Sequence, residues 1–253
     1  DLHSFPTRRS SDLPGFMMCR CLTGSRPVTS LTPMVTSSGR PDPAPSPGPQ
    51  GTSGGPRGGG TAQDRQPSGT GFVRPAAPTD LPTMGRLHAA TMLASLEAAH
   101  RSAHGAPLPV GVRAVISAPV VATGWEQAVG DPPSPAHHVL LATQGETVVG
   151  LLGLAPTQML DDDGAPIPGG RAAEVTALGV DPAHQRQGHG SRLLAAAADL
   201  ARTDGAGALS VWAVHGDESL TRFLAAAGLQ PSGAHRLLPV GLGITENCWT
   251  AAL

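Results

Sequence analysis

Regular spacing of apolar and polar residues begins only near Gly71. Phe72–Arg74 is typical of a short strand, and an approximate apolar stripe predicts a helix from there to about His100. Thr79 or Asp80 caps this expected helix, and Pro82 fits its first turn. Prolines then interrupt the pattern, so we expect 111–135 to be irregular apart from a short helix around Trp125.

The rest of the chain predicts a hairpin followed by alternating strands and helices. Two aliphatic runs flank Gln144-Gly145-Glu146, which indicates a hairpin. Leu193, Leu194, Ala197, Leu200 and Ala201 then share one face of a helix. A mixed α/β sheet with flanking helices follows from this order. The expected strands are Val139–Thr143, Thr147–Ala155, Ala173–Val180, Ala208–Val214, Ala234–Val240 and Ile244–Leu253, and the expected helices are Gly188–Thr203 and Leu220–Ala227.

The first 70 residues are expected to form a separate, low-complexity segment. Gly, Pro, Ser and Thr make up about two thirds of 37–70, which cannot bury enough apolar surface to offset the entropy of ordering. We therefore expect disorder, with a Pro-rich docking ligand as the alternative. Residues 1–13 include SFPTRRSSDL, which resembles a translated DNA-sequencing adapter and is interpreted as an assembly artefact. The alternative is a basic targeting leader.

Composition narrows the chemistry that the chain can perform. The 253 residues include no Lys and no Tyr, so lysine nucleophiles and tyrosine acids are excluded. After Gly71, 10 Arg accompany 15 Asp and Glu, which argues against a basic nucleic-acid-binding face. Three scattered cysteines predict neither a disulfide framework nor a zinc site and favour a reducing cytoplasm. No apolar run reaches the length of a membrane span.

One segment, Glu174–Leu194, carries a candidate binding motif. A strand leads to Asp181-Pro182, and Gln185, Gly188 and Gly190 follow at QxxGxG spacing where the next helix starts. Backbone N–H groups in such a turn, together with the positive end of the helix, form an anion site. The glycine spacing alone is weak, since an ordinary helix-start loop has the same pattern. It matches neither the GxGxxG fingerprint nor the GxxxxGK[ST] phosphate loop.

The whole segment resembles the acetyl-CoA signature of the GNAT family of N-acetyltransferases. That signature is a strand ending in VxP, then [QR]xxGx[GA], then an amphipathic helix, here Val180, Pro182, Gln185, Gly188 and Gly190. The resemblance spans about residues 71–253, because the opening strand and helix and the late helix also look like their family counterparts. It implies a mixed, mostly antiparallel sheet with splayed central strands, flanked by helices.

The resemblance also implies roles for individual residues. Pantetheine would pair with the strand edge, Asp217 stands where the family often has a cofactor-contacting Asn, and Arg192 would add charge. Backbone amides would hold the pyrophosphate of acetyl-CoA. The implied cofactor-binding residues are Leu178, Gly179, Val180, Gln185, Arg186, Gln187, Gly188, His189, Gly190, Ser191 and Asp217.

Glu174 is the candidate catalytic base. It lies 14 positions before Gly188, where the histone-acetyltransferase branch of the family has its general base. Counting alternate positions, Glu174, Thr176, Leu178 and Val180 share a strand face unless a bulge intervenes. A carboxylate there would take a proton from an ammonium acceptor, and the N–H of Leu178 would stabilise the oxyanion. The alternative is an exposed residue at a strand start.

The resemblance thus implies an N-acetyltransferase that moves an acetyl group from acetyl-CoA to a primary amine, without metal. The family's usual Tyr acid is missing, since Leu224 follows Phe223, and Ser219 or water would replace it. The alternatives are a weak or inactive acyl-CoA-binding module, a nucleotide-binding protein and a structural protein. We expect a small-molecule or peptide amine as partner, and neither nucleic acid nor membrane; a homodimer is compatible with the sequence, which does not fix the acceptor.

Overall fold

The computed structural model describes residues 71–161, 165–238 and 243–253. The expected disorder of 1–70, the adapter-like stretch and most of the polar loop at 161–164 lie outside these residues. The helices are α1 (Leu81–His104), α2 (Val110–Val115), α3 (Ala118–Gly130), α4 (His189–Thr203) and α5 (Glu218–Ala226), with short 3₁₀ turns η3 (Pro78–Asp80) and η4 (Pro182–His184). The strands are β1 (Gly71–Pro75), β2 (His138–Gln144), β3 (Thr147–Leu160), β4 (Pro166–Val180), β5 (Ala208–Val214), β6 (Gln230–Leu237) and β7 (Thr245–Ala252).

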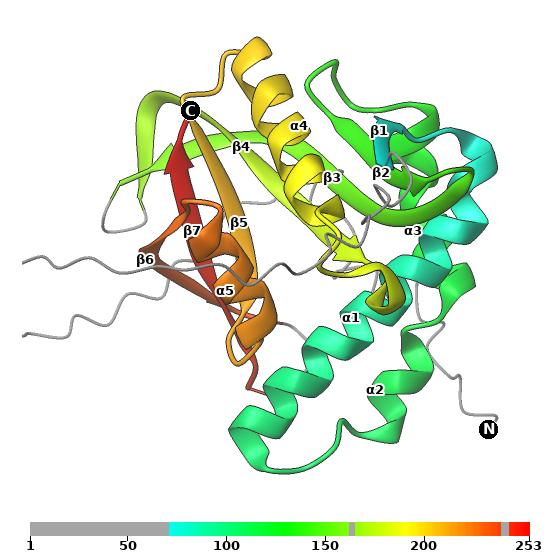
Figure 1. The fold of residues 1–253 in the computed structure, drawn as a ribbon. Coiled ribbons are helices and arrows are strands. Elements are labelled where there is room, and N and C mark those ends of the chain that lie inside the picture. The colour runs from blue at the N-terminus through cyan, green and yellow to red at the C-terminus, as the bar shows by residue number, and fades with distance from the viewer. Residues whose placement is uncertain (1–70, 162–164, 239–242) are drawn as a thin grey trace, which may run out of the picture. The chain divides into compact units, whose positions relative to one another are not determined.

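The strands of this part of the chain form one mixed sheet. Its order is β1-β2-β3-β4-β5-β7-β6 (Figure 1). The central pair β4 and β5 runs parallel, whereas the neighbouring pairs are antiparallel. The expectation of a mixed, mostly antiparallel sheet is therefore confirmed. α4 provides the crossover that a parallel β4–β5 pair requires.

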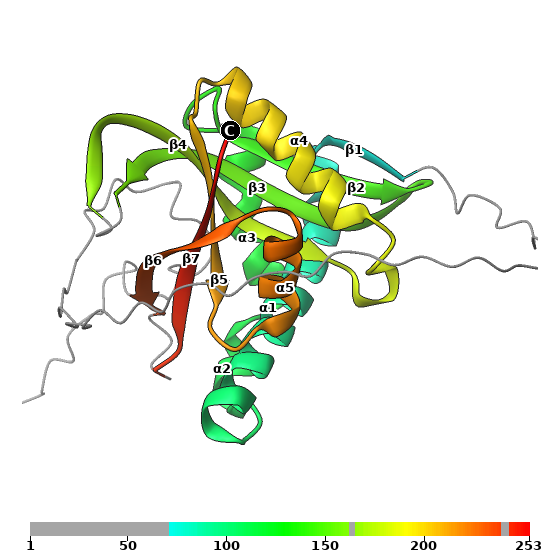
Figure 2. The same cartoon turned by 60° about the vertical axis from the view of Figure 1, so that its left-hand side comes forward.

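Helices cover the two faces of the sheet with separate apolar clusters. On one face, Leu193 of α4 and Leu224 of α5 pack with Val175 and Val211 from the central strands. On the other, Met84 of α1 and Trp125 of α3 pack with Leu141 and Leu151 of β2 and β3. Figure 2 shows α4 and α5 in front of the sheet and α3 behind it. Leu193, Leu224, Met84 and Trp125 are at most 1% exposed, so both clusters are core.

Two segments that were expected to be irregular are ordered. Residues 110–115 and 118–130 form α2 and α3, so the short helix expected around Trp125 is present, but the prediction that most of 111–135 is irregular is wrong. Pro119 lies in the first turn of α3, where its missing N–H costs nothing. The stretch between the expected strands Thr147–Ala155 and Ala173–Val180 is also more regular than expected, since β3 extends to Leu160 and β4 begins at Pro166.

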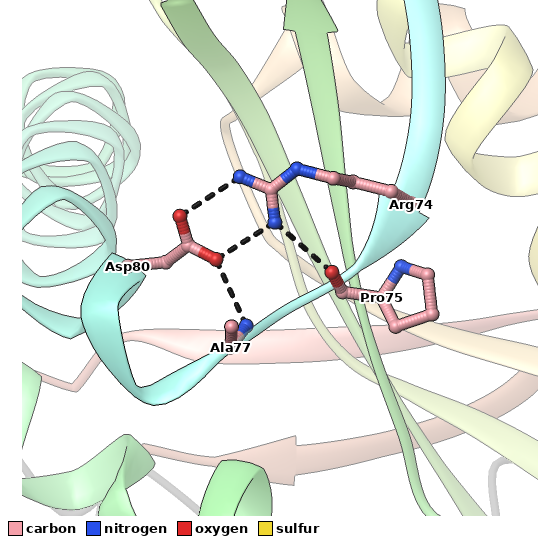
Figure 3. A network of polar contacts seen from close by, with 4 residues as sticks. All are labelled: Arg74, Pro75, Ala77 and Asp80. Atoms are coloured by element: carbon pink, nitrogen blue, oxygen red, sulfur yellow. Dashed lines mark hydrogen bonds and ion pairs between the residues drawn. The ribbon is translucent and has the colours of Figure 1, made fainter. Parts of the chain in front are cut away.

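An ion pair fixes the junction between β1 and α1. The Arg74 guanidinium donates to both carboxylate oxygens of Asp80 at 2.7 and 2.8 Å, and the Ala77 N–H donates to Asp80 at 2.8 Å (Figure 3). Hydrogen bonding from Arg74 lowers the pKa of Asp80 below its usual value. The Asp80 side chain makes no capping hydrogen bond to α1. Asp80 therefore stands at the N-cap position of α1, as expected, but its side chain secures the strand-to-helix turn and does not cap the helix.

Candidate functional site

The two central strands pair over only part of their length. Ala172–Val175 of β4 pairs with Ala208–Val211 of β5. Beyond these residues, β4 continues to Val180 with β3 as its partner, and β5 continues to Val214 with β7 as its partner. The inner edges of 176–180 and 212–214 thus lie outside the β4–β5 ladder. Backbone N–H and C=O groups that face such a gap are able to pair with an extended ligand.

A β-bulge lies where β4 leaves its partner. Gly153 of β3 pairs with Ala177 and the next residue, Leu154, pairs with Val175, so Thr176 is the extra residue. Val175 and Leu178 both pack in the α4 cluster, whereas Ala177 packs in the α1–α3 cluster. A bulge shifts the alternation of a strand by one residue.

The bulge corrects the expected placement of Glu174. Ala173 and Val175 pack in the α4 cluster, so Glu174, between them, points to the opposite face. Leu178 lies on the α4 side, and Val180 lies near the start of α4. Simple alternation predicted that Glu174 shares a strand face with Leu178 and Val180. Because of the bulge, this prediction is wrong. The carboxylate and the strand end lie on opposite sides of the sheet, beside the same gap.

The turn after β4 presents backbone N–H groups at the start of α4. Asp181 accepts from the Ala183 N–H at 2.8 Å, and Gln185 donates to the Val180 carbonyl at 3.2 Å. The N–H of Arg192 is bonded to the Gly188 carbonyl at 3.0 Å, so the N–H groups of residues 189–191 precede the first helical bond. Residues 185–188 and Ser191 are exposed. These groups and the helix dipole suit an anion.

Two residues of this turn adopt left-handed backbone conformations. Gly188, the N-cap of α4, has a φ of 82°, and Arg186 has a φ of 60°. Arg186 is the non-glycine residue with a positive φ within the described ranges. Glycine adopts such a conformation without strain, so the backbone angle at position 188 favours glycine. A β-carbon on Gly190 would lie 3.4 Å from the Phe223 ring, which is an ordinary contact. Packing therefore does not require glycine at position 190.

His189 and Arg192 add side chains to the same turn. The Arg192 guanidinium lies 3.2 Å from the Nδ1 of His189 and donates to the Gln187 carbonyl at 3.1 Å. His189 is 3% exposed. Burial, with the nearby Arg192 and His184, lowers the pKa of His189. His189 is therefore neutral near pH 7 and leaves Arg186 and Arg192 as the cations of the turn.

α1 contacts both strands on either side of the gap. A β-carbon on Gly179 would lie 2.6 Å from the Thr91 hydroxyl, so α1 and β4 are in close contact. Ser95 donates to one carboxylate oxygen of Asp217 at 2.6 Å, and the Leu220 N–H donates to the other at 3.1 Å. Asp217 is thus the N-cap of α5 and is tied to α1. The sequence singled out Asp217 but did not indicate this structural use.

Glu174 lies in a polar cluster that sequence reasoning missed. Its carboxylate is 3.8 Å from the Arg236 guanidinium, and its side chain is 19% exposed. It stands within β4, well after the strand begins at Pro166, so the alternative of an exposed strand start is wrong. Arg236 also binds Glu246 and stacks on Trp212. These residues come from four strands, and no local pattern in the sequence links them.

In the described ranges, His, Cys, Asp and Glu side chains nowhere gather in threes as metal ligands. Over the same residues, no helix combines the length and apolarity that crossing a membrane requires. Cys248 is buried in β7, as expected, and burial raises the pKa of its thiol.

Comparisons with known proteins agree with this geometry. Residues 113–228 match the model of the acetyltransferase (GNAT) family. No curated protein matches the chain.

Among solved structures, a PaiA N-acetyltransferase from Thermoplasma acidophilum in complex with coenzyme A is 12% identical. The match covers 73% of this chain and 99% of that one, with a TM-score of 0.53. A GCN5-related N-acetyltransferase from Rhodopseudomonas palustris is 18% identical, with 74% and 98% covered and a TM-score of 0.51. At these identities the likeness concerns the fold. The family match identifies an acetyltransferase (GNAT) domain at residues 113–228.

Proposed function

We propose that this protein is an N-acetyltransferase that transfers the acetyl group of acetyl-CoA to a primary amine. The observation that carries the proposal is the parting of β4 and β5 beside the exposed start of α4. A diphosphate fits the turn and an extended thioester arm fits the strand edge, so one long ligand would use both. We propose that the domain occupies residues 71–253, since β1, α1, β6 and β7 belong to the same sheet and clusters.

The binding roles follow from the placement of each group. The N–H groups of Arg186–Ser191 would hold the pyrophosphate, with Arg186 and Arg192 adding positive charge. The edge of β4 at Leu178–Val180 would pair with pantetheine. Both carboxylate oxygens of Asp217 already accept hydrogen bonds, one from Ser95 and one from Leu220. We therefore propose only a minor role for Asp217 in coenzyme binding. When bound, acetyl-CoA supplies an activated acyl group with a thiolate as leaving group.

Glu174 would act as the base in a direct transfer within a ternary complex. The amine becomes nucleophilic only after it loses a proton, which a carboxylate at this position would accept directly or through water. The N–H of Leu178 would donate to the oxyanion of the tetrahedral intermediate. The chain has no Tyr to protonate the thiolate. A thiol with a pKa of about 8.5 leaves without a dedicated acid, and Ser219 or water would supply the proton.

The role of Glu174 is tested with Glu174→Gln. We expect turnover to fall by about 100-fold or more, because the amide cannot accept the proton. The Kd for acetyl-CoA, measured by calorimetry on the full chain, should stay within about twofold. Glu218→Gln is the matched control, since this 80% exposed residue of α5 undergoes the same chemical change away from the gap. Equal turnover in both variants across pH would remove Glu174 from the mechanism.

The second candidate function is an acyl-CoA-binding module with weak or no catalysis. It is favoured by the absence of Tyr and by the engagement of both carboxylate oxygens of Asp217. Thiol release from acetyl-CoA, followed against a panel of amines after coenzyme binding has been measured, separates the two. Binding without amine-dependent release would establish the module and reject the enzyme.

A further inference from the structure

A polar cluster crosses the half of the sheet that follows the gap. Glu174 of β4 pairs with Ser210 of β5, and Trp212 lies two residues further along the same face. Glu246 of β7 stands directly opposite Arg236 of β6. Leu209, Val211 and Ala213 point to the α4 cluster, so Glu174, Trp212, Arg236 and Glu246 lie on the other face.

Arg236 contacts three side chains of the cluster, namely Glu246, Trp212 and Glu174. Its Nε donates to Glu246 Oε2 at 2.5 Å, and the guanidinium carbon lies 4.2 Å from the centre of the Trp212 ring. Its Nη1 is 3.8 Å from Glu174 Oε1, which is an ionic contact and too long for a hydrogen bond. Nη1 is buried and has no hydrogen-bond partner among the described residues.

The burial and charge of the cluster strengthen the ionic contact between Arg236 and Glu174. The side chains of Glu174, Arg236 and Glu246 are 19%, 27% and 12% exposed, so water screens them less than a surface pair. Two carboxylates share one guanidinium. The hydrogen bond that Arg236 donates to Glu246 and the stacking on Trp212 fix the guanidinium, so its charge stays beside Glu174 whatever the acceptor does.

We infer that Arg236 is a positioning residue that keeps the Glu174 carboxylate charged and oriented toward the acceptor. This rests on the proposed function, and it deepens that function by naming what prepares the base. The ionic contact favours the anion without the directional hydrogen bonds of a bidentate pair. The nearby guanidinium charge favours the ionised carboxylate, which is the form that takes a proton from the acceptor.

Neighbouring strands contribute further groups to the cluster around Glu174. β7 contributes Glu246 and Cys248, and burial raises the pKa of that thiol, which is therefore neutral at physiological pH. β5 contributes Ser210 and Trp212, which do not titrate in this range. Within the described residues, Arg236 is thus the cation of the cluster and Glu246 its second anion.

The first test is a direct titration of Glu174 by carbon NMR in the full chain, with the signal assigned through Glu174→Gln. In Arg236→Gln we expect the midpoint to rise by about one pH unit or more, because an opposite charge has been removed. Arg236→Lys keeps the charge and should restore most of the shift. Glu246→Gln should move the midpoint the other way, because it removes a like charge.

The second test is the pH dependence of kcat/KM. In Arg236→Gln the acid limb should move to higher pH with the NMR midpoint, while the Kd for acetyl-CoA stays within about twofold. Arg222→Gln is the matched control, since Arg222 makes an exposed pair with Glu218 on α5; neither the limb nor the midpoint should move. A uniform loss of rate without a shift, or unmoved midpoints in both cluster variants, would overturn the inference.

The two proposals fail separately. If the wild-type chain transfers no acetyl group to any amine, the proposed function is rejected, yet the NMR midpoints still report whether Arg236 controls Glu174. If transfer occurs and the midpoints do not move, the function stands and the role of Arg236 is rejected.

Discussion

At the scale of single residues, His88 shows how burial fixes a protonation state. This histidine of α1 is 7% exposed, and its Nδ1 accepts a hydrogen bond from the Trp125 indole N–H at 3.1 Å. Burial lowers the pKa of His88 to about 4. Because Nδ1 is the acceptor, the neutral ring carries its proton on Nε2. His88 therefore joins α1 to α3 as an uncharged polar group.

His88 should make the fold sensitive to acid. Its folded pKa lies below the unfolded value of about 6.5, so its stabilising contribution is complete above about pH 6.5 and is lost as pH falls toward 4. From these values, the wild type should lose about 2–3 kcal/mol of unfolding free energy between pH 7.5 and 4.5 through this residue. Urea unfolding of wild type and His88→Gln at both pH values measures the difference.

The variant should lose less stability than the wild type over this pH range, since glutamine does not titrate. His215→Gln, at an exposed position after β5, should keep the wild-type pH dependence. Identical slopes for His88→Gln and the wild type would show that His88 is not the group responsible.

At the scale of elements, α1 and α3 approach closely at Gly85. A β-carbon there would overlap the Ala118 carbonyl oxygen and lie 2.7 Å from the Ala122 β-carbon. The carbonyl belongs to the backbone and cannot rotate away. Glycine destabilises an isolated helix relative to alanine, but at position 85 the close contact between two helices requires it.

Gly85→Ala should therefore destabilise the protein, by about 1–3 kcal/mol. Alanine is normally the better helix former by about 1 kcal/mol, so the sign is reversed here by tertiary contact. Gly111→Ala in α2 is the matched control, because nothing lies within 4 Å of its added carbon. That variant should be neutral or slightly more stable in thermal unfolding. A gain in both variants would contradict the packing argument.

The same scale shows what the sequence could predict. The apolar stripe of α4 is local, so its spacing gave the helix correctly. The short helix expected around Trp125 is α3, but its extent was not predicted because Pro119 reads as a breaker when its place in the first turn is unknown. The bulge at Thr176 leaves no mark on the alternation of residues. The Arg236 cluster was missed because its members meet only after four strands have paired.

At the scale of the whole domain, a ligand that joins the turn before α4 to the edge of β4 contacts groups that are brought together only in the folded chain. Such a ligand binds the folded chain alone, so it should raise the melting temperature. At about 100 times its Kd, coenzyme A should add about 2.7 kcal/mol to the free energy of unfolding.

Gly188→Ala should abolish most of that thermal shift. The alanine would have to adopt a φ of 82° at the proposed diphosphate turn, which costs about 1–2 kcal/mol before any ligand binds. Gly228→Ala carries the same backbone cost at a φ of 88° after α5, with open space around it. Both variants should melt earlier, but only Gly228→Ala should keep the coenzyme shift. An equal shift in both would place the diphosphate elsewhere.

The extra residue in β4 also predicts which single-residue deletions the strand tolerates. Val175 and Ala177 already pair with the consecutive residues Leu154 and Gly153 and face opposite sides of the sheet. Deleting Thr176 would join them in uniform pairing, and the residues on both flanks would keep their faces. Deleting Ala173, which is regularly paired, would instead turn one flank of β4 over, so loss of that codon should be far more damaging than loss of the codon for Thr176.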